Sequence, residues 1–147
     1  METKFNSQIC TTREQSERLL ALGLKKETAD MAHNKNTVIP KYKIVPVSDW
    51  GLLSELEEIT YIPAWSLHRL LSLLPKYIRV RKESFGRFRW TILELTIDAE
   101  LVVWYREDID NFKVNENFYA EDIYTSLCDC IEWLIKEGYF NKDYLEE

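Results

Sequence analysis

The sequence has few of the residues on which most catalytic and metal-binding motifs depend: four glycines, three cysteines and two histidines among 147 residues. The glycines are isolated at positions 23, 51, 86 and 138, so no glycine-rich phosphate-binding loop is present. Two histidines in unrelated contexts offer few choices for a general base or a zinc ligand. We therefore predict no catalytic residue, no cofactor and no metal site.

Long apolar runs are also missing. The longest, such as 101–105, reach about five residues, whereas a membrane-spanning helix needs ~20. The first six residues contain no apolar core of a signal peptide. The odd number of cysteines (Cys10, Cys128 and Cys130) then favours free thiols in a reducing cytosol. We predict a cytoplasmic protein that has no contact with a membrane.

The close pair Cys128 and Cys130 does not fit a metal site. Residues i and i+2 of a helix lie ~200° apart around its axis, so the two thiols point to opposite sides. We expect small, buried or half-buried side chains here, which share neither a ligand nor a disulfide.

Charge is distributed unevenly around a net value of −6. Residues 76–89 carry six basic side chains against one acidic, whereas residues 90–147 carry four basic against 15 acidic. The acidic end could pair with the basic stretch within the fold, or each could face a partner.

Pattern and turn residues predict an α+β fold in a single domain, 1–147, with a helical part (11–75), a three-stranded antiparallel meander (77–107) and a long amphipathic helix (118–137) packed on the sheet. The helical part is predicted to begin with a helix that ends at Gly23; Thr12 with Gln15 fits a capping box at its start, and Thr11 with Glu14 fits equally well. The other predicted elements are a short helix 26–32, a loop 33–41, an extended segment 42–47, a helix 48–58, and a helix 63–74 with Pro63 in its first turn.

The meander has a predicted register in which residue 97 faces residue 100, because this groups the apolar side chains of both strands on one face. A polar loop is expected at 108–116. The predicted core consists of Leu70, Leu74, Leu93, Leu95, Val102, Trp104, Ile123, Leu127, Ile131 and Leu134.

Three stretches look familiar together: Leu19-Leu20-x-Leu22-Gly23-Leu24-x3-Thr28-Ala29-Asp30-Met31, Pro63-Ala64-Trp65-Ser66-Leu67-x2-Leu70-Leu71-x-Leu73-Leu74-Pro75 and Glu132-Trp133-Leu134-x3-Gly138-Tyr139. This set resembles a family of short hypothetical proteins from prophage-like and mobile-element regions of gut bacteria. The resemblance implies a genomic setting; it implies no activity and no catalytic residues.

The basic stretch is the strongest candidate for a binding surface. Arginines alternate with aromatic side chains along two strands, a composition typical of sheets that bind single-stranded nucleic acid. The candidate contact residues are Arg79, Arg81, Phe85, Arg87 and Arg89. We expect the four arginines on one continuous face, relieved by Asp108 and Asp110. The competing interpretation is that the arginines are solvated or paired, with Phe88 and Trp90 in the core.

These observations favour a non-catalytic accessory or interaction protein of a prophage or mobile element, which binds another protein or a second copy of itself. The alternative is a small nucleic-acid-binding module that uses the ribbon 76–90. A helix-turn-helix over 12–32 is a weaker variant, because its second helix would carry the acidic Glu27 and Asp30.

Overall fold

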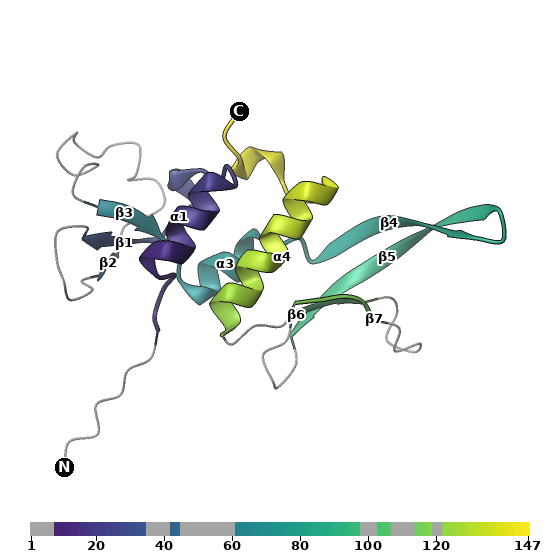
Figure 1. Ribbon diagram of the computed structural model, residues 1–147, viewed down its shortest axis with the longest axis horizontal. Helices are drawn as coiled ribbons and strands as arrows, with labels where there is room; N and C mark the ends of the chain where they lie inside the picture. The colour runs from purple at the N-terminus through teal and green to yellow at the C-terminus, as the bar shows by residue number, and fades with distance from the viewer. Residues whose placement is uncertain (1–7, 35–41, 45–60, 98–102, 107–113, 119–121) are drawn as a thin grey trace, which may run out of the picture. The chain divides into compact units, whose positions relative to one another are not determined.

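The computed structural model describes the chain in six segments, namely 8–34, 42–44, 61–97, 103–106, 114–118 and 122–147. The chain clusters into two compact units: unit 1 comprises residues 1–71 and 142–147, and unit 2 comprises residues 72–141. Helices and antiparallel strands occur together (Figure 1), which confirms the predicted α+β class. No helix within the six segments is long and apolar enough to cross a membrane.

Unit 1 is built around a small antiparallel sheet with the strand order β2-β1-β3. Its elements are α1 (Arg13–Ala21), η1 (Lys26–Thr28), β1 (Met31–Asn34), β2 (Tyr42–Ile44), β3 (Tyr61–Ala64), η3 (Lys142–Tyr144) and the start of α3 (Leu67–Leu73), whose last residues belong to unit 2.

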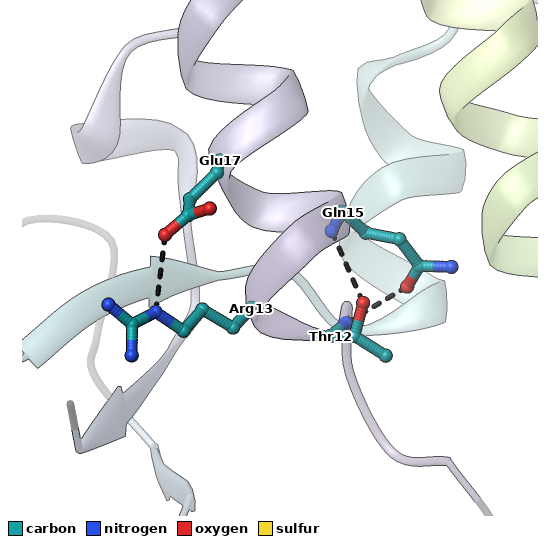
Figure 2. Close-up of polar contacts among 4 residues, drawn as sticks. All are labelled: Thr12, Arg13, Gln15 and Glu17. Atoms are coloured by element: carbon teal, nitrogen blue, oxygen red, sulfur yellow. Dashed lines mark hydrogen bonds and ion pairs between the residues drawn. The ribbon is translucent and has the colours of Figure 1, made fainter. Parts of the chain in front are cut away.

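The start of α1 confirms the predicted capping box (Figure 2). The Thr12 hydroxyl accepts from the Gln15 backbone N–H at 3.2 Å, and the Gln15 side chain accepts from the Thr12 N–H at 2.9 Å. Two of the N–H groups that a helix start leaves unpaired are thereby satisfied. Arg13 and Glu17, one turn apart, form an exposed ion pair, and the helix ends before Gly23 as expected.

The predicted second helix, 26–32, is wrong, and with it the helix-turn-helix over 12–32. Only the single 3-10 turn η1 forms, because the Thr28 hydroxyl donates to the Lys25 carbonyl at 2.6 Å and closes the turn on itself. The chain then extends into β1, which pairs with β3 from Met31 opposite Ala64 to Asn34 opposite Tyr61. The predicted loop 33–41 therefore begins inside a strand.

Pro63 lies in β3 and not in the first turn of a helix, so that prediction is wrong as well. Within the described sheet β3 is an edge strand, where the missing N–H of proline removes no ladder hydrogen bond that the sheet needs. Residues 42–44 of the predicted extended segment form β2, whereas the predicted helix 48–58 lies outside the described residues.

Unit 2 contains an antiparallel sheet with the strand order β4-β5-β6-β7 and one long helix. Its elements are β4 (Tyr77–Ser84), β5 (Arg87–Ile97), β6 (Val103–Arg106), β7 (Val114–Phe118) and α4 (Ile123–Glu137). The predicted meander is thus present with a fourth strand, β7. This strand takes up the end of the predicted loop 108–116 and the first residue of the predicted helix 118–137.

The helix α4 has the predicted end and a later start. Asp122 is its N-cap, and the Asp122 carboxylate accepts from the Thr125 N–H at 2.9 Å. Gly138 ends the helix with a φ of 80°, a left-handed conformation that glycine adopts without strain.

The register between β5 and β6 differs from the prediction: Ile97 faces Val103, and Leu95 faces Tyr105. Val103 and Tyr105 are fully buried. Residues 101–105 are apolar at both odd and even positions, so their alternation could not identify the buried face.

Aromatic side chains join α4 to the sheet of unit 2. The Trp133 ring lies 6.0 Å from Tyr105 of β6 and 5.7 Å from Phe118 of β7, measured between ring centroids. Neither Tyr105 nor Phe118 belonged to the predicted core. The predicted core residues that are buried are Leu70, Leu74, Leu93, Leu127, Ile131 and Leu134. Leu95 and Ile123 are partly exposed, Val102 lies outside the described residues, and only the backbone of Trp104 is described.

Candidate functional site

Two of the motifs that carry the family resemblance bond to each other inside unit 1. The Trp65 indole N–H donates to the Thr28 hydroxyl at 3.0 Å. The Asp30 carboxylate accepts from the Ser66 backbone N–H at 2.8 Å and from the Ser66 hydroxyl at 2.5 Å. Arg69 Nε donates to the Thr28 carbonyl at 2.6 Å. These side chains hold the segment before β1 against the start of α3, so their role is structural.

Ser66 therefore acts as a helix cap and not as a nucleophile. Its hydroxyl accepts from the Arg69 backbone N–H at 3.1 Å while it donates to Asp30. His68, the one histidine close to it in sequence, is exposed.

A cysteine and a histidine meet in the interior of unit 1. Cys10 Sγ lies 3.7 Å from His33 Nε2, and the same nitrogen donates to the Thr11 carbonyl. Both side chains are buried. Burial, together with the smaller effect of the nearby Asp30 carboxylate, raises the pKa of the Cys10 thiol to about 12. The thiol remains protonated at neutral pH, so it is not an activated nucleophile.

This thiol predicts a loss of stability in alkaline solution. The pKa of Cys10 is higher in the folded state, so the thiol contributes stability that is complete below pH 9.0 and is lost as the pH rises towards about 12. Burial also raises the pKa values of Cys130 and Tyr105. We expect urea unfolding to give a constant free energy from pH 7 to 8 and a falling one above pH 9.0. Cys10→Ala should make that decline shallower; an unchanged decline would contradict the assignment.

The cysteines of α4 are buried free thiols, as is Cys10. Cys128 and Cys130 follow each other at i and i+2 on one helix, as the sequence predicted. Within the six described segments, no three histidine, cysteine or acidic side chains are grouped so that they could hold a metal ion.

A surface cavity of about 440 Å³ lies in unit 1, beside η1 and η3. Its walls carry both signs of charge, with Lys25 and Arg69 on one hand and Glu27, Asp143 and Glu146 on the other. Because the charges nearly cancel, the cavity favours no class of ligand.

The β4–β5 hairpin is the most distinctive surface of unit 2 (Figure 1). β4 pairs with β5 over its whole length, from Tyr77 opposite Glu94 to Ser84 opposite Arg87, whereas β6 pairs with β5 only between Glu94 and Ile97. Between Glu94 and the turn, residues 87–93 of β5 pair only with β4, so this part of the hairpin is a two-stranded ribbon in the described part of the chain.

A two-residue turn closes this ribbon. Phe85 has a φ of 53° and Gly86 a φ of 73°, the combination required by the type I′ turns of tight hairpins. Asparagine, aspartate or glycine normally occupies the first of these positions, because a side chain with a bulky Cβ substituent is strained there. Phe85 is nonetheless fully exposed and gains no packing in return.

We expect Phe85→Asn to stabilise the protein by about 0.5–1 kcal/mol, because asparagine tolerates the left-handed conformation that costs phenylalanine about 1 kcal/mol. Urea unfolding of the two proteins would measure the difference. Phe85→Leu is the matched control, since leucine keeps an apolar side chain under the same strain and should leave stability within about 0.5 kcal/mol. A destabilising Phe85→Asn would show that the ring makes stabilising contacts.

The predicted continuous face of four arginines is wrong. Arg79 pairs with Ile92 and Arg81 with Trp90, whereas position 87 pairs with Ser84 and position 89 with Lys82. With a two-residue turn, odd positions of β4 share a face with even positions of β5. Arg79 and Arg81 therefore lie on one face, and positions 87 and 89 belong to the other.

Arg79 and Arg81 share their face with a row of large apolar side chains. Each member of the row is more than half exposed: Tyr77, Phe88, Trp90 and Ile92. We call this set, with the two arginines, the aromatic face of the hairpin. The expectation that Phe88 and Trp90 line the core is therefore wrong.

Cation–π contacts organise the aromatic face. The Arg79 guanidinium lies 4.5 Å from the centroid of the Trp90 ring, and the Arg81 guanidinium lies 3.9 Å from that of Phe88. Each ring is a diagonal neighbour across the two strands. Stacking holds the guanidinium groups over the rings while leaving their edges free to donate hydrogen bonds.

The acidic partner of Arg81 lies on the hairpin itself. Arg81 forms an ion pair with Glu83 at 3.6 Å, with both side chains at least half exposed. The proposed partners Asp108 and Asp110 lie outside the described residues. Glu83 and Glu94 lie at strand positions on the same side as the aromatic face, and the Lys76 ammonium lies 5.5 Å from the centroid of the Tyr77 ring, so charges of both signs surround the aromatic face.

Fold and site together define an α+β protein with an exposed, aromatic and arginine-bearing hairpin. The chain matches no protein-family model, no curated protein and no solved structure. Its function has to be inferred from the chemistry of the hairpin.

Proposed function

We propose that this is a cytoplasmic, non-catalytic interaction protein of a prophage or mobile element, and that it binds a protein partner through the aromatic face. The observation that carries the proposal is the row of exposed Tyr77, Phe88, Trp90 and Ile92 beside two stacked arginines. Tyrosine, tryptophan and arginine are the residues that most often dominate the binding energy of protein interfaces. The motif resemblance supports the genomic setting.

Charge favours a protein over a nucleic acid as the partner. Phosphate binding requires a net positive surface, whereas Glu83 and Glu94 lie on the same side of the hairpin as Arg79 and Arg81, and the whole chain carries −6. The four arginines do not combine into one basic track, because the hairpin register divides them between two faces.

Nucleic-acid binding remains the second candidate, and one observation favours it. Phe85, fully exposed at the turn, and the stacked rings of Phe88 and Trp90 could each contact a base of a single strand. In that case the basic positions on both faces would contact phosphates.

Photo-crosslinking tests the proposed function. A benzophenone amino acid at position 90 reports on the aromatic face, and the same amino acid at position 87 is the control on the opposite face. We expect a protein adduct from position 90 only, identified by mass spectrometry and reproduced with the purified partner. Trp90→Ser should abolish binding of that partner. A crosslink that nuclease treatment removes would contradict the proposal and support the alternative.

A gel shift at two salt concentrations separates the two candidates directly, because phosphate contacts make affinity fall steeply with salt. We expect that the protein does not retard the oligonucleotide at either salt concentration. Salt-sensitive binding that Arg79→Glu with Arg81→Glu abolishes, at unchanged stability, would overturn the protein-partner proposal. Flanking genes of prophage type would support the genomic setting.

A further inference from the structure

The outer edge of β4 has main-chain groups that point away from the sheet. The Leu95 N–H donates to the Lys76 carbonyl at 2.9 Å, which identifies 76 and 95 as a hydrogen-bonded pair. Such pairs alternate with non-bonded pairs in an antiparallel ladder, so even positions of β4 bond to β5. The N–H and C=O groups of the odd positions, including Arg79 and Arg81, therefore face outwards.

No strand in the described part of the chain pairs with this outer edge, since β4 comes first in the strand order β4-β5-β6-β7. The edge is eight residues long, enough for an extended peptide to bond at Tyr77, Arg79, Arg81 and Glu83. Strand addition to an open sheet edge is an established mode of peptide recognition.

Charge argues against a second copy of β4 as the added strand. A two-fold antiparallel pair centred on Val80 would place Arg79 opposite Arg81 twice. Pairs centred on Arg81 or on position 82 would place one of the two arginines opposite Glu83 but the other opposite an arginine or Phe85, so no such register gives both arginines a carboxylate. Like charges directly opposite each other destabilise a strand pair. Basic side chains on an edge strand are a common protection against self-pairing.

The same charges are complementary to an acidic strand. We propose that β4 accepts an extended segment of the partner protein that carries acidic side chains at alternate positions, opposite Arg79 and Arg81. This inference rests on the proposed function and specifies how the partner is bound. Main-chain hydrogen bonds supply affinity, and the two stacked guanidinium groups select carboxylates.

The test uses the full chain and a fluorescent, end-blocked octapeptide of alternating glutamate and valine. In the proposed register each glutamate N–H faces β4 and each valine N–H faces away. N-methylation of the glutamates should therefore abolish binding measured by anisotropy, whereas N-methylation of the valines should leave it within about threefold. Equal binding of the two N-methylated peptides, or of a lysine–valine peptide, would overturn the inference.

Variants of the protein test the charge selection. Arg79→Glu with Arg81→Glu should weaken the peptide at least tenfold, roughly the effect of reversing two exposed ion pairs. Arg87→Glu, the same change on the opposite face, should alter affinity by less than about twofold. Amide exchange at residues 79 and 81 should slow when the peptide binds. An unchanged exchange rate would exclude edge pairing, and concentration-dependent self-association through β4 would show that a second copy, and not an acidic segment of a partner, occupies the edge.

Failure of this inference can be distinguished from failure of the proposed function. If the position 90 crosslink to the partner persists while the peptide does not bind, the aromatic face is used without strand addition. If the crosslink and the peptide both fail, the hairpin is not a protein-binding surface. Competition by an oligonucleotide for the same face would identify the second candidate function.

Discussion

Replacing Trp65 by alanine should lower the free energy of unfolding by about 3–5 kcal/mol. Trp65 is fully buried in unit 1, and its indole N–H donates to the Thr28 hydroxyl at 3.0 Å. The substitution removes the largest side chain that is fully buried among the described residues, and it leaves a cavity beside the start of α3. Guanidinium unfolding followed by far-UV circular dichroism measures the loss.

Trp65→Phe is the matched control for that substitution. Phenylalanine keeps most of the ring packing and loses the hydrogen bond, while Thr28 can still donate to the Lys25 carbonyl. We expect a loss of about 1–2 kcal/mol. A loss below about 1 kcal/mol for Trp65→Ala would mean that unit 1 does not depend on this core residue.

Leu127→Ala should cost about 2–5 kcal/mol in the same measurement. Leu127 is fully buried on α4, within the helix that packs on β6 and β7. Leu95→Ala is the comparison in the sheet: Leu95 is partly exposed, so its truncation should cost less than Leu127→Ala. Equal losses would show that Leu95 is as deeply buried as Leu127, in contradiction to the structure.

The two large substitutions also test the predicted single domain, because Trp65 lies in unit 1 and Leu127 in unit 2. If residues 1–147 unfold as one cooperative domain, each substitution shifts one common transition. Two transitions, each moved by only one of the substitutions, would contradict that prediction.

Elements whose signals are local in sequence were predicted well. The capping box of Thr12 and Gln15, the end of α4 at Gly138 and the hairpin strands all depend on residues a few positions apart. β1 and β3 are different, because strands of four residues form through pairing between Met31 and Ala64, 33 positions apart. Nothing in their local sequence distinguishes them from a helix or a loop.

The candidate site was predicted in composition and missed in geometry. The sequence identified Arg79, Arg81 and Phe85 as exposed residues of one ribbon. It could not show that Trp90 and Phe88 lie beneath the guanidinium groups, because that depends on the turn length. Counting loop residues would have helped: Phe85-Gly86 fits a two-residue turn with a glycine in its second position.

The turn at Gly86 decides which of two surfaces this hairpin displays. If Ser84 or Arg87 joined the turn, the strands would slip by one residue; positions 79, 81, 87 and 89 would then share one side, and the rings of Phe88 and Trp90 would lie on the other. The ribbon would then present a polybasic track instead of an aromatic surface with charges of both signs. If the hairpin binds a partner as we propose, one backbone conformation sets the class of partner, and a change at the turn would alter that class while leaving Arg79, Arg81, Phe88 and Trp90 in place.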